Sequence, residues 1–446
     1  MSNENAKNGP RVAIVGGGLA GLAAAAYMQS RGYGVEIFES RRALGGRAGS
    51  FRDMQTGQTI DRCRHVAMGC CSRLIDFCSR VGISDLFDRH KVLHFFAPGK
   101  DPNRYDFLAT ERLPPPYHLC PAMMRLGYLS VVERGKILLT LRRLLKTSAR
   151  DETIGQWLRR QGQSERAIER FWGVVLESAL SEKLYRASLA AARKVFVDGF
   201  MRTRDGYELL IPRKPLAELF DRRVGDYLRQ KGVTLHRGTR VVQIDGEKNR
   251  AVSLNISSGE RKHYDAFIVA VPWYAVRKLF SPSLLAALPE LEHAEKIPAA
   301  PITALHLWYD RSITDLPHAV LVGRLSQWFF NQGNGYSQVV VSASHDLVAR
   351  NRKHICRQIT AELQEVFPAA RDTRLIHWRL VTEPRAVFSL QPGVEKLRPQ
   401  QKTPLHNLAL AGDWTDTSWP ATMEGAVRSG YAAAEVIVDI MKNSRL

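Results

Sequence analysis

Three glycines in the pattern Gly16-x-Gly18-x-x-Gly21, followed by the acidic residue Glu39, form the group with the clearest chemistry in this sequence. The first glycine permits a tight turn, the second lets backbone approach a pyrophosphate, and the third lets a helix pack close to a strand. Phosphates sit at the N-terminus of such a helix, where unpaired N–H groups favour negative charge. Glu39 follows at the spacing of roughly 20 residues at which a carboxylate accepts hydrogen bonds from ribose hydroxyls. The pattern predicts a site for a dinucleotide with an unphosphorylated adenosine ribose.

These residues need flanking elements to hold them, and the neighbouring sequence predicts a strand, a helix and a second strand. Val12–Val15 is a short β-branched run of the kind that a fully buried parallel strand shows. An alanine-rich helix follows to Ser30, and Gly32 and Gly34 end it. Val35–Glu39 then forms the second strand. The sequence therefore predicts one βαβ unit with the glycines in its first turn.

A second glycine-rich turn that contains arginines, Arg41–Arg47, follows Glu39 directly. Arginine can form charge-assisted hydrogen bonds to a diphosphate. The segment resembles the extension that holds the pyrophosphate and the flavin side of FAD in the amine oxidase and phytoene desaturase superfamily. The resemblance implies that Arg42, Gly46 and Arg47 contact the cofactor.

The C-terminal part of the sequence carries a second motif. Leu408–Asp413 is a predicted strand ending in Gly-Asp, and Trp414–Trp419 leads from it to Pro420–Gly430, which opens a helix. This run resembles the second FAD motif of the same superfamily, which dehydrogenases that use NAD alone do not carry. Both motifs together favour FAD as the cofactor.

The same resemblance assigns roles within the C-terminal and middle segments. It implies that Gly412 and Asp413 bind the ribityl–pyrophosphate region. It also implies that the N–H groups near Thr422 and Met423 face the pyrimidine end of the isoalloxazine, where the reduced flavin carries negative charge. Val242 stands where superfamily members contact adenine with a backbone amide. Since no cysteine stands near the C-terminal motif, FAD is expected to be non-covalent.

The segments of cofactor type are scattered along the chain, which implies a nucleotide-binding domain interrupted twice by a second domain. We expect an α/β fold, with a Rossmann-like FAD-binding domain whose parallel sheet is discontinuous in sequence, and a second, α+β substrate domain. The FAD-binding domain is assigned to residues 10–90, 205–285 and 395–446. The substrate domain is assigned to residues 91–204, which face the substrate or a membrane, and 286–394.

The composition is that of an ordinary globular protein, with 446 residues of which 45% are hydrophobic and 24% charged. It excludes disulfide-rich mini-proteins, collagens, coiled coils and wholly disordered chains. The formal net charge of +20 favours an anionic partner. No nucleic-acid-binding module accompanies that charge, so nucleic acid is not expected. The 6 cysteines lack paired metal-ligand spacing, so no metal is expected and the thiols should be reduced.

The chain shows no signal that would carry it through a membrane. The first residues are polar, and no window approaches the roughly 18 apolar residues of a spanning helix. Residues 117–150 mix apolar and basic side chains, which suits a helix lying in an anionic membrane interface and equally a surface helix packed on its own domain. We expect a cytoplasmic protein that is peripheral on the inner face of the cytoplasmic membrane. The apolar members of the segment are Tyr117, Met123, Met124, Leu126, Tyr128 and Leu129, and the basic ones are Arg125, Arg134, Lys136, Arg142, Arg143, Lys146 and Arg150.

Over nearly its whole length the chain resembles the hydroxysqualene dehydroxylases, also called squalene-associated FAD-dependent desaturases. The matching segments are Asp61–Cys71, Arg170–Ser188, Pro301–Asn331 and the C-terminal motif. In the first of them, Cys63-Arg64 stands where Gly and Gln commonly precede the histidine, His65. The resemblance implies a C30 isoprenoid alcohol as substrate and a place in squalene and hopanoid biosynthesis.

Reductive removal of a hydroxyl group needs a general acid, because hydroxide is a poor leaving group. His65, with Asp61 shortly before it in the sequence, is the candidate acid, and a structural histidine bonded to backbone is the alternative. Trp414 and Trp419 flank the C-terminal motif, and we expect one of them to form an aromatic wall above the flavin, with Trp419 as the candidate. The candidates for lining an apolar substrate tunnel, or for ordinary core, are Trp308, Trp328, Phe329 and Phe330.

The FAD motifs do not give the direction of hydride transfer. A carotenoid or phytoene-type desaturase, which takes hydride out of a polyene, therefore stays open beside the dehydroxylase. A non-catalytic flavoprotein that binds isoprenoids is the third hypothesis. The sequence does not name the electron donor that would recharge the flavin.

Overall fold

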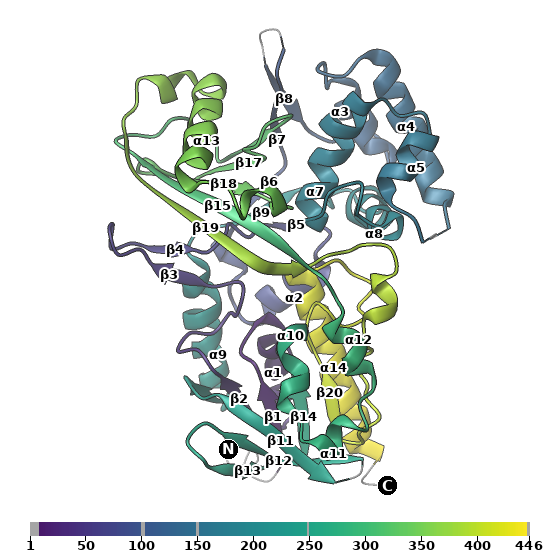
Figure 1. The fold of residues 1–446 in the computed structure, drawn as a ribbon, viewed down its shortest axis with the longest axis vertical. Helices are drawn as coiled ribbons and strands as arrows, with labels where there is room; N and C mark the ends of the chain where they lie inside the picture. The colour runs from purple at the N-terminus through teal and green to yellow at the C-terminus, as the bar shows by residue number, and fades with distance from the viewer. Residues whose placement is uncertain (1–8, 100–102, 149–150, 248, 444–446) are drawn as a thin grey trace.

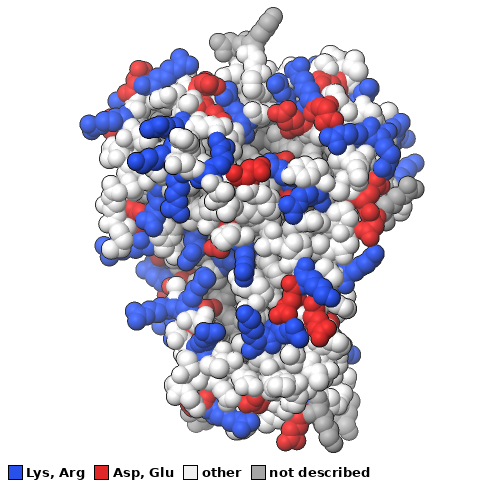
Figure 2. Space-filling model, viewed as in Figure 1, with Lys and Arg blue, Asp and Glu red and all other residues white. Residues whose placement is uncertain are grey.

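The computed structural model describes residues 9–99, 103–148, 151–247 and 249–443. In the view of Figure 1, a layered unit around a parallel sheet fills the lower half, and a larger sheet with a group of helices fills the upper half. The first and last described elements of the chain both lie in the lower half. On the face shown in Figure 2, Lys and Arg are spread over both halves, with Asp and Glu among them.

The parallel sheet has five strands in the order β10 (Thr234–Arg237), β2 (Gly34–Glu39), β1 (Arg11–Val15), β14 (Ala266–Val269) and β20 (Leu408–Leu410). All neighbouring pairs are parallel. β14 and β20 are buried throughout, which explains their uninterrupted apolar sequences. The strands come from three separate stretches of the chain, and the expected α/β fold with a discontinuous parallel sheet is confirmed.

Helices cover the parallel sheet. α1 (Leu19–Gln29) is alanine-rich and almost wholly buried, because small side chains let it lie closely against its neighbours. It packs beside α14 (Met423–Asn443), and the rings of Tyr27 and Tyr431 meet between the two helices. The other α- and π-helices of this half are α2 (Ser72–Arg80), the π-helix η6 (Ala217–Arg223), α9 (Val224–Gln230), α10 (Trp273–Val276), α11 (Pro282–Leu285) and α12 (Glu290–Glu295).

The upper half is built on a seven-stranded sheet. Its long antiparallel pair, β15 (Ala299–Tyr309) and β19 (Leu375–Phe388), crosses the middle of the molecule (Figure 1). α13 (Arg352–Val366) packs its apolar side on this sheet. The sheet continues from β15 through β18 (Tyr336–Val341), β17 (Trp328–Asn331), β16 (His318–Leu321), β7 (Leu93–Phe96) and β8 (Arg104–Phe107).

Short helices complete the upper half. A Ser-x-x-Glu and a Thr-x-x-Gln sequence form capping boxes at the starts of α4 (Val131–Lys146) and α5 (Ile154–Arg160). Within the described ranges, every helix is too short or too polar to cross a membrane. The remaining α- and π-helices are α3 (Cys120–Met124), α6 (Glu165–Ala167), the π-helix η4 (Ile168–Gly173), α7 (Val174–Leu180), α8 (Leu189–Lys194) and the π-helix η5 (Val195–Met201).

Three small sheets accompany the two large ones. β11 (Val241–Glu247), β12 (Arg250–Ile256) and β13 (Arg261–His263) form a meander in the lower half. The other two sheets are β3 (Ser50–Arg52) with β4 (Thr59–Asp61), and β5 (Ala67–Met68) with β9 (Leu209–Pro212) and β6 (Phe87–His90).

Candidate active site

A cavity of about 920 Å³ is lined by residues of both halves, and most of the candidate residues meet in it. Of the candidate catalytic and cofactor-binding residues, three do not line it: Gly21, Arg42 and Asp61. The candidates in its wall are Gly16, Gly18, Glu39, Gly46, Arg47, His65, Val242, Gly412, Asp413, Trp419, Thr422 and Met423.

The turn between β1 and α1 forms one end of the cavity. Gly16 has φ +110°, a conformation that favours glycine, and a Cβ there would lie 2.5 Å from the carbonyl oxygen of Ala270. Gly21 lies behind the turn, where a Cβ would be 2.0 Å from the carbonyl oxygen of Gly16. A Cβ on Gly18 would meet no atom closer than the Cα of Gly46, at 3.9 Å. The backbone at the start of α1 is therefore bare toward the cavity, as close approach of a pyrophosphate requires.

Glu39 ends β2 beside this turn and is buried. Its Oε2 accepts a hydrogen bond from the N–H of Gly17 at 2.8 Å, and its Oε1 accepts one from the N–H of Arg41 at 2.8 Å. These bonds hold the carboxylate in the cavity wall next to the glycine turn. The remaining lone pairs of its oxygens can accept hydrogen bonds from ribose hydroxyls.

Arg47 and Asp413 join the two motifs by an ion pair between Nη2 and Oδ1. Nη1 of Arg47 also donates to the carbonyl oxygen of Ala386 at 2.9 Å. Burial lowers the pKa of Arg47, but the Asp413 carboxylate outweighs it and the pKa is raised. The pair places one cation and one anion in the cavity wall. The guanidinium of Arg47 can bind a diphosphate there, and the carboxylate of Asp413 can accept hydrogen bonds from ribityl hydroxyls.

The expectation for Arg42 needs correction. Arg42 is exposed and does not line the cavity. Its neighbour Arg41 lies in the wall, and its Nη1 donates to the carbonyl oxygen of Gly46 at 3.4 Å. The two arginines are adjacent in sequence, so only the course of the turn after β2 decides which one reaches the site.

The C-terminal motif closes the cavity with a loop and a helix start. The N–H of Gly412 donates to Ser429 Oγ at 2.8 Å, which ties the end of β20 to α14. Thr422 and Met423 stand at the beginning of α14 and line the cavity, so the positive end of the helix dipole faces that region. Trp414 also lines the cavity; its side chain is buried and its Nε1 donates to the carbonyl oxygen of Val271 at 2.9 Å.

Trp414 and Trp419 both line the cavity, and of the two Trp419 is the less buried. Lys194 Nζ lies 5.1 Å and the guanidinium of Arg428 lies 4.5 Å from its ring centroid. Both cations are within the range of cation–π attraction and hold the indole in place. Lys194 also lines the cavity. Its position near Trp419 could not be predicted from the sequence, because the two residues belong to distant segments of the chain.

His65 lines the cavity as a neutral imidazole. Its Nδ1 lies 2.8 Å from the carbonyl oxygen of Cys63, and a carbonyl only accepts, so Nδ1 carries the proton and Nε2 is left as an acceptor. Burial lowers the pKa of His65; the Cys63 carbonyl and Asp61 oppose this, and Arg47 and Arg64 lower it further. The net lowering keeps the ring neutral near pH 7.

Asp61, the other candidate of this segment, directs its carboxylate to groups other than His65. Its Oδ1 accepts hydrogen bonds from Ser50 Oγ at 2.6 Å and from the N–H of Leu216 at 2.7 Å, and its Oδ2 lies 3.7 Å from Arg64 Nη1. Burial is the main reason that the pKa of Asp61 is raised. Asp61 therefore anchors the segment before His65 to β3 and η6 from behind the cavity wall.

The part of the cavity in the upper half is mainly apolar, and we call it the apolar chamber. Trp328 and Phe330 line it, but Trp308 and Phe329 do not. Trp308 is stacked on Tyr336 within the upper half, and Phe329 belongs to the core under α13. The other apolar residues of the chamber include Leu93, Phe95, Val174, Val175, Val195, Phe200, Leu209, Ile302, Val320 and Val340.

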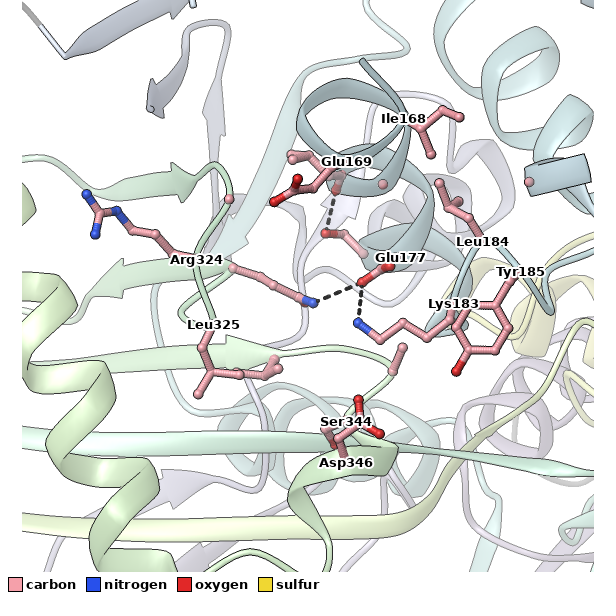
Figure 3. A pocket seen from close by; sticks show the side chains of 18 of the residues that line it. Ile168, Glu169, Glu177, Lys183, Leu184, Tyr185, Arg324, Leu325, Ser344 and Asp346 are labelled. Carbon is pink, nitrogen blue, oxygen red and sulfur yellow. Dashed lines mark hydrogen bonds and ion pairs between the residues drawn. The ribbon is translucent and has the colours of Figure 1, made fainter. Parts of the chain in front are cut away.

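A second cavity of about 540 Å³ adjoins the first, and Val174 and Ser178 line both. It is lined by charged residues of both signs. Figure 3 shows Glu177 and Lys183 turned toward one another within it, with Lys183 Nζ 2.8 Å from Glu177 Oε2. Burial raises the pKa of Glu177.

The chain is similar to flavoenzymes over almost its whole length. The family model described as flavin containing amine oxidoreductase matches residues 19–438. A hydroxysqualene dehydroxylase of Zymomonas mobilis is 30% identical over 95% of this chain and 98% of that protein. A 15-cis-phytoene desaturase of Solanum lycopersicum is 24% identical over 96% of this chain and 77% of that protein. The solved structure of cyclohexylamine oxidase from Brevibacterium oxydans has a TM-score of 0.71 at 18% identity, over 97% of this chain and 100% of that one, and shows a common fold.

The bare glycine turn, the carboxylate of Glu39 and the start of α14 suit the diphosphate, the ribose and the isoalloxazine of FAD, respectively. The protein is therefore an FAD-dependent oxidoreductase. The chain belongs to the flavin-containing amine oxidoreductase family.

Proposed function

We propose that this enzyme reductively removes the hydroxyl group of hydroxysqualene to form squalene, in squalene and hopanoid biosynthesis. The observation that carries the proposal is a single cavity in which the dinucleotide cradle opens onto an apolar chamber with one histidine, His65, in its wall. Such a chamber suits a C30 hydrocarbon chain with one hydroxyl group. The 30% identical relative named hydroxysqualene dehydroxylase supports the same substrate.

In its reduced form, bound FAD supplies a hydride. The protein must orient the alcohol, exclude water and provide a proton to the departing hydroxyl group. We assign the proton to Nε2 of His65, which takes it from solvent before the substrate is enclosed. Because the pKa of His65 is lowered, its imidazolium is a stronger acid than that of a free histidine.

Trp419 is assigned to the wall of the flavin site. Lys194 and Arg428 already lie over its ring, so its π-system is engaged by protein cations. Stabilisation of a developing positive charge on the substrate therefore falls to the rings of Trp328 and Phe330 in the chamber.

We assign the membrane contact, on the inner face of the cytoplasmic membrane, to the surface of α3 and α4. Val131 and Val132 are 64% and 67% exposed, and Tyr117, Met124 and Leu139 are exposed beside them in the same segment. Arg142 and Arg143 on α4 are exposed basic neighbours for anionic headgroups. Met123, Leu126, Tyr128 and Leu129 are buried in the core and take no part, and Arg150 lies outside the described residues.

A carotenoid or phytoene-type desaturase is the second candidate, and the state of His65 favours it. A desaturase removes a hydride and a proton, so its site needs a base. The neutral ring of His65, with Nε2 as an acceptor, is suited to receive a proton. The 24% identical phytoene desaturase supports this class of substrate.

Product analysis separates these functions. The purified holoenzyme is incubated with hydroxysqualene and a chemical reductant, and in parallel with phytoene and an electron acceptor. Squalene from the first incubation supports the proposal, and a product lighter by two hydrogens from the second supports the desaturase. Bound FAD that is reducible but gives no product in either incubation indicates a non-catalytic isoprenoid-binding flavoprotein.

A further inference from the structure

The loop 413–419, which carries Asp413 and Trp419 into the cavity wall, is wrapped around one guanidinium group. The side chain of Arg398 is 0% exposed. Its Nη2 donates to the carbonyl oxygens of Asp413 at 3.1 Å, Thr415 at 2.6 Å and Trp419 at 3.1 Å, and to Thr417 Oγ1 at 3.2 Å. All four acceptors belong to this loop.

The segment that contains Arg398 supports the loop along its length. Gln401 Nε2 donates to Thr415 Oγ1 at 2.9 Å and to the carbonyl oxygen of Asp416 at 2.8 Å. The N–H of Asp416 donates in return to the carbonyl oxygen of Pro399 at 2.8 Å. Two stretches of chain are thereby joined side by side.

The positive charge of the buried guanidinium also requires partners, and these come from loop 413–419 and from two neighbouring side chains. Arg398 Nη1 donates to Glu395 Oε2 at 2.8 Å, and the guanidinium lies 4.9 Å from the ring centroid of Phe388. A buried cation needs compensation, and here the loop carbonyls supply much of it. Removing the cation would leave those carbonyls facing an empty polar space, so the loop would have to rearrange.

We propose that Arg398 is a positioning residue for FAD. Its guanidinium draws the carbonyl groups of loop 413–419 inward and so fixes where the Asp413 carboxylate and the Trp419 ring enter the cavity. Arg398 itself does not line the cavity. The loop also holds Ser418 at φ +53°, a conformation that a free loop rarely adopts. The proposal depends on FAD binding alone and not on the substrate.

The test compares the holoenzymes of Arg398→Met and Arg398→Lys with the wild type. FAD retention on serial dilution gives the dissociation constant, and the visible circular dichroism of the FAD-saturated protein reports the flavin surroundings. We expect FAD to bind at least about tenfold more weakly to Arg398→Met, since several hydrogen bonds to a charged group are lost. Arg398→Lys should fall between, because an ammonium keeps the charge but lacks the planar fork. Both variants should show an altered flavin signal at saturation.

Arg324→Met is the matched control. Arg324 has a side chain only 14% exposed and pairs with Glu365, away from loop 413–419. This control should keep the FAD affinity and the flavin signal of the wild type. Native affinity and an unchanged flavin signal in both Arg398 variants would overturn the proposal. If Arg398→Met does not fold, as judged by far-ultraviolet circular dichroism, the affinity and flavin signal of Arg398→Lys decide alone.

Discussion

At the scale of single residues, the protonation of His65 separates the proposed reaction from its alternative. If Nε2 must donate a proton, only the protonated ring is active, and its pKa is lowered from 6.5. Activity on hydroxysqualene should therefore increase as pH falls through 7 and 6, and decline about tenfold per pH unit on the alkaline side. A profile of kcat/KM between about pH 5 and pH 8 measures this.

A pH profile of kcat/KM with the opposite slope would identify His65 as a base. A neutral His65 that accepts a proton gives activity that is lost as pH falls below its pKa and is constant above it. His65→Gln should remove the pH-dependent limb in either case and keep bound FAD, since the glutamine amide cannot titrate. Hydroxysqualene turnover by His65→Gln equal to that of the wild type would show that another group moves the proton.

The ion pair between Arg47 and Asp413 predicts an effect on stability. Asp413→Asn leaves the guanidinium of Arg47 without its carboxylate partner in a mostly buried place. We expect the free energy of unfolding in urea to fall by about 1–3 kcal/mol, discounted because the Arg47 side chain keeps some contact with water. The control Asp226→Asn breaks an exposed pair with Arg229 and should change it by less than about 0.5 kcal/mol. Equal effects of the two substitutions would contradict this assignment.

Sequence alone places a candidate residue well where the local backbone determines its position. Gly16, Gly18 and Glu39 belong to one local βαβ unit, so their spacing fixes their positions. The sequence places Asp61 near His65 but does not show its hydrogen-bond partners, which are Ser50 and the backbone N–H of Leu216 from a distant segment. The sequence gives no sign of the role of Arg398. Its four acceptors lie in loop 413–419, which β20 separates from Arg398 along the chain, and no spacing rule predicts a contact of that kind.

At the scale of elements, the contact between β1 and α1 predicts a strong response to one methyl group. Gly21→Ala would place a Cβ 2.0 Å from the carbonyl oxygen of Gly16, so α1 must move away from the glycine turn. We expect a loss of about 2–3 kcal/mol in the free energy of unfolding and weaker FAD retention. In Gly135→Ala, on α4, the new methyl meets nothing within 4 Å, and the variant should be more stable by about 0.5–1 kcal/mol. If Gly21→Ala is as stable as the wild type, the close contact is not required.

The exposed apolar end of α4 predicts membrane binding. The double variant Val131→Glu, Val132→Glu should lower cosedimentation with vesicles containing anionic phospholipid severalfold, because both apolar insertion and charge attraction are weakened. The control pair Val348→Glu, Ile376→Glu changes equally exposed residues elsewhere and should bind as the wild type does. Binding that is the same for all three proteins would place the membrane contact elsewhere.

The elements themselves were largely predictable, for a physical reason. Strands buried on both faces appear as short apolar runs, and Val12–Val15 and Ala266–Val269 are examples. The amphipathic segment at 117–150 was harder, because apolar side chains in a mixed sequence can face either core or solvent. Met123 and Leu126 face the core, whereas Val131 and Val132 face outward, and only packing decides between them.

At the scale of the whole molecule, the cavity that is the candidate FAD site is lined by three distant stretches of chain. The glycine turn, Val242 and the loop at Asp413 come from separate parts of the sequence and meet around one cavity. The ion pair of Arg47 with Asp413 is a direct link between the first and last of them. A ligand that contacts all three stabilises their association more than one that contacts a single stretch.

This arrangement predicts how FAD and its fragments stabilise the protein. FAD at about 100 times its dissociation constant should raise the free energy of unfolding by about 2.7 kcal/mol. ADP at the same concentration should raise the melting temperature less, because it reaches the glycine turn and Glu39 but not the C-terminal motif. In the Asp413→Asn variant, FAD should raise the melting temperature less than in the wild type, whereas the effect of ADP should be unchanged. The difference in melting temperature between the two ligands should therefore be smaller. Thermal melting followed by tryptophan fluorescence, at equal ligand concentrations, gives the comparison. Equal melting temperatures with FAD and with ADP would show that the C-terminal loop contributes nothing to binding.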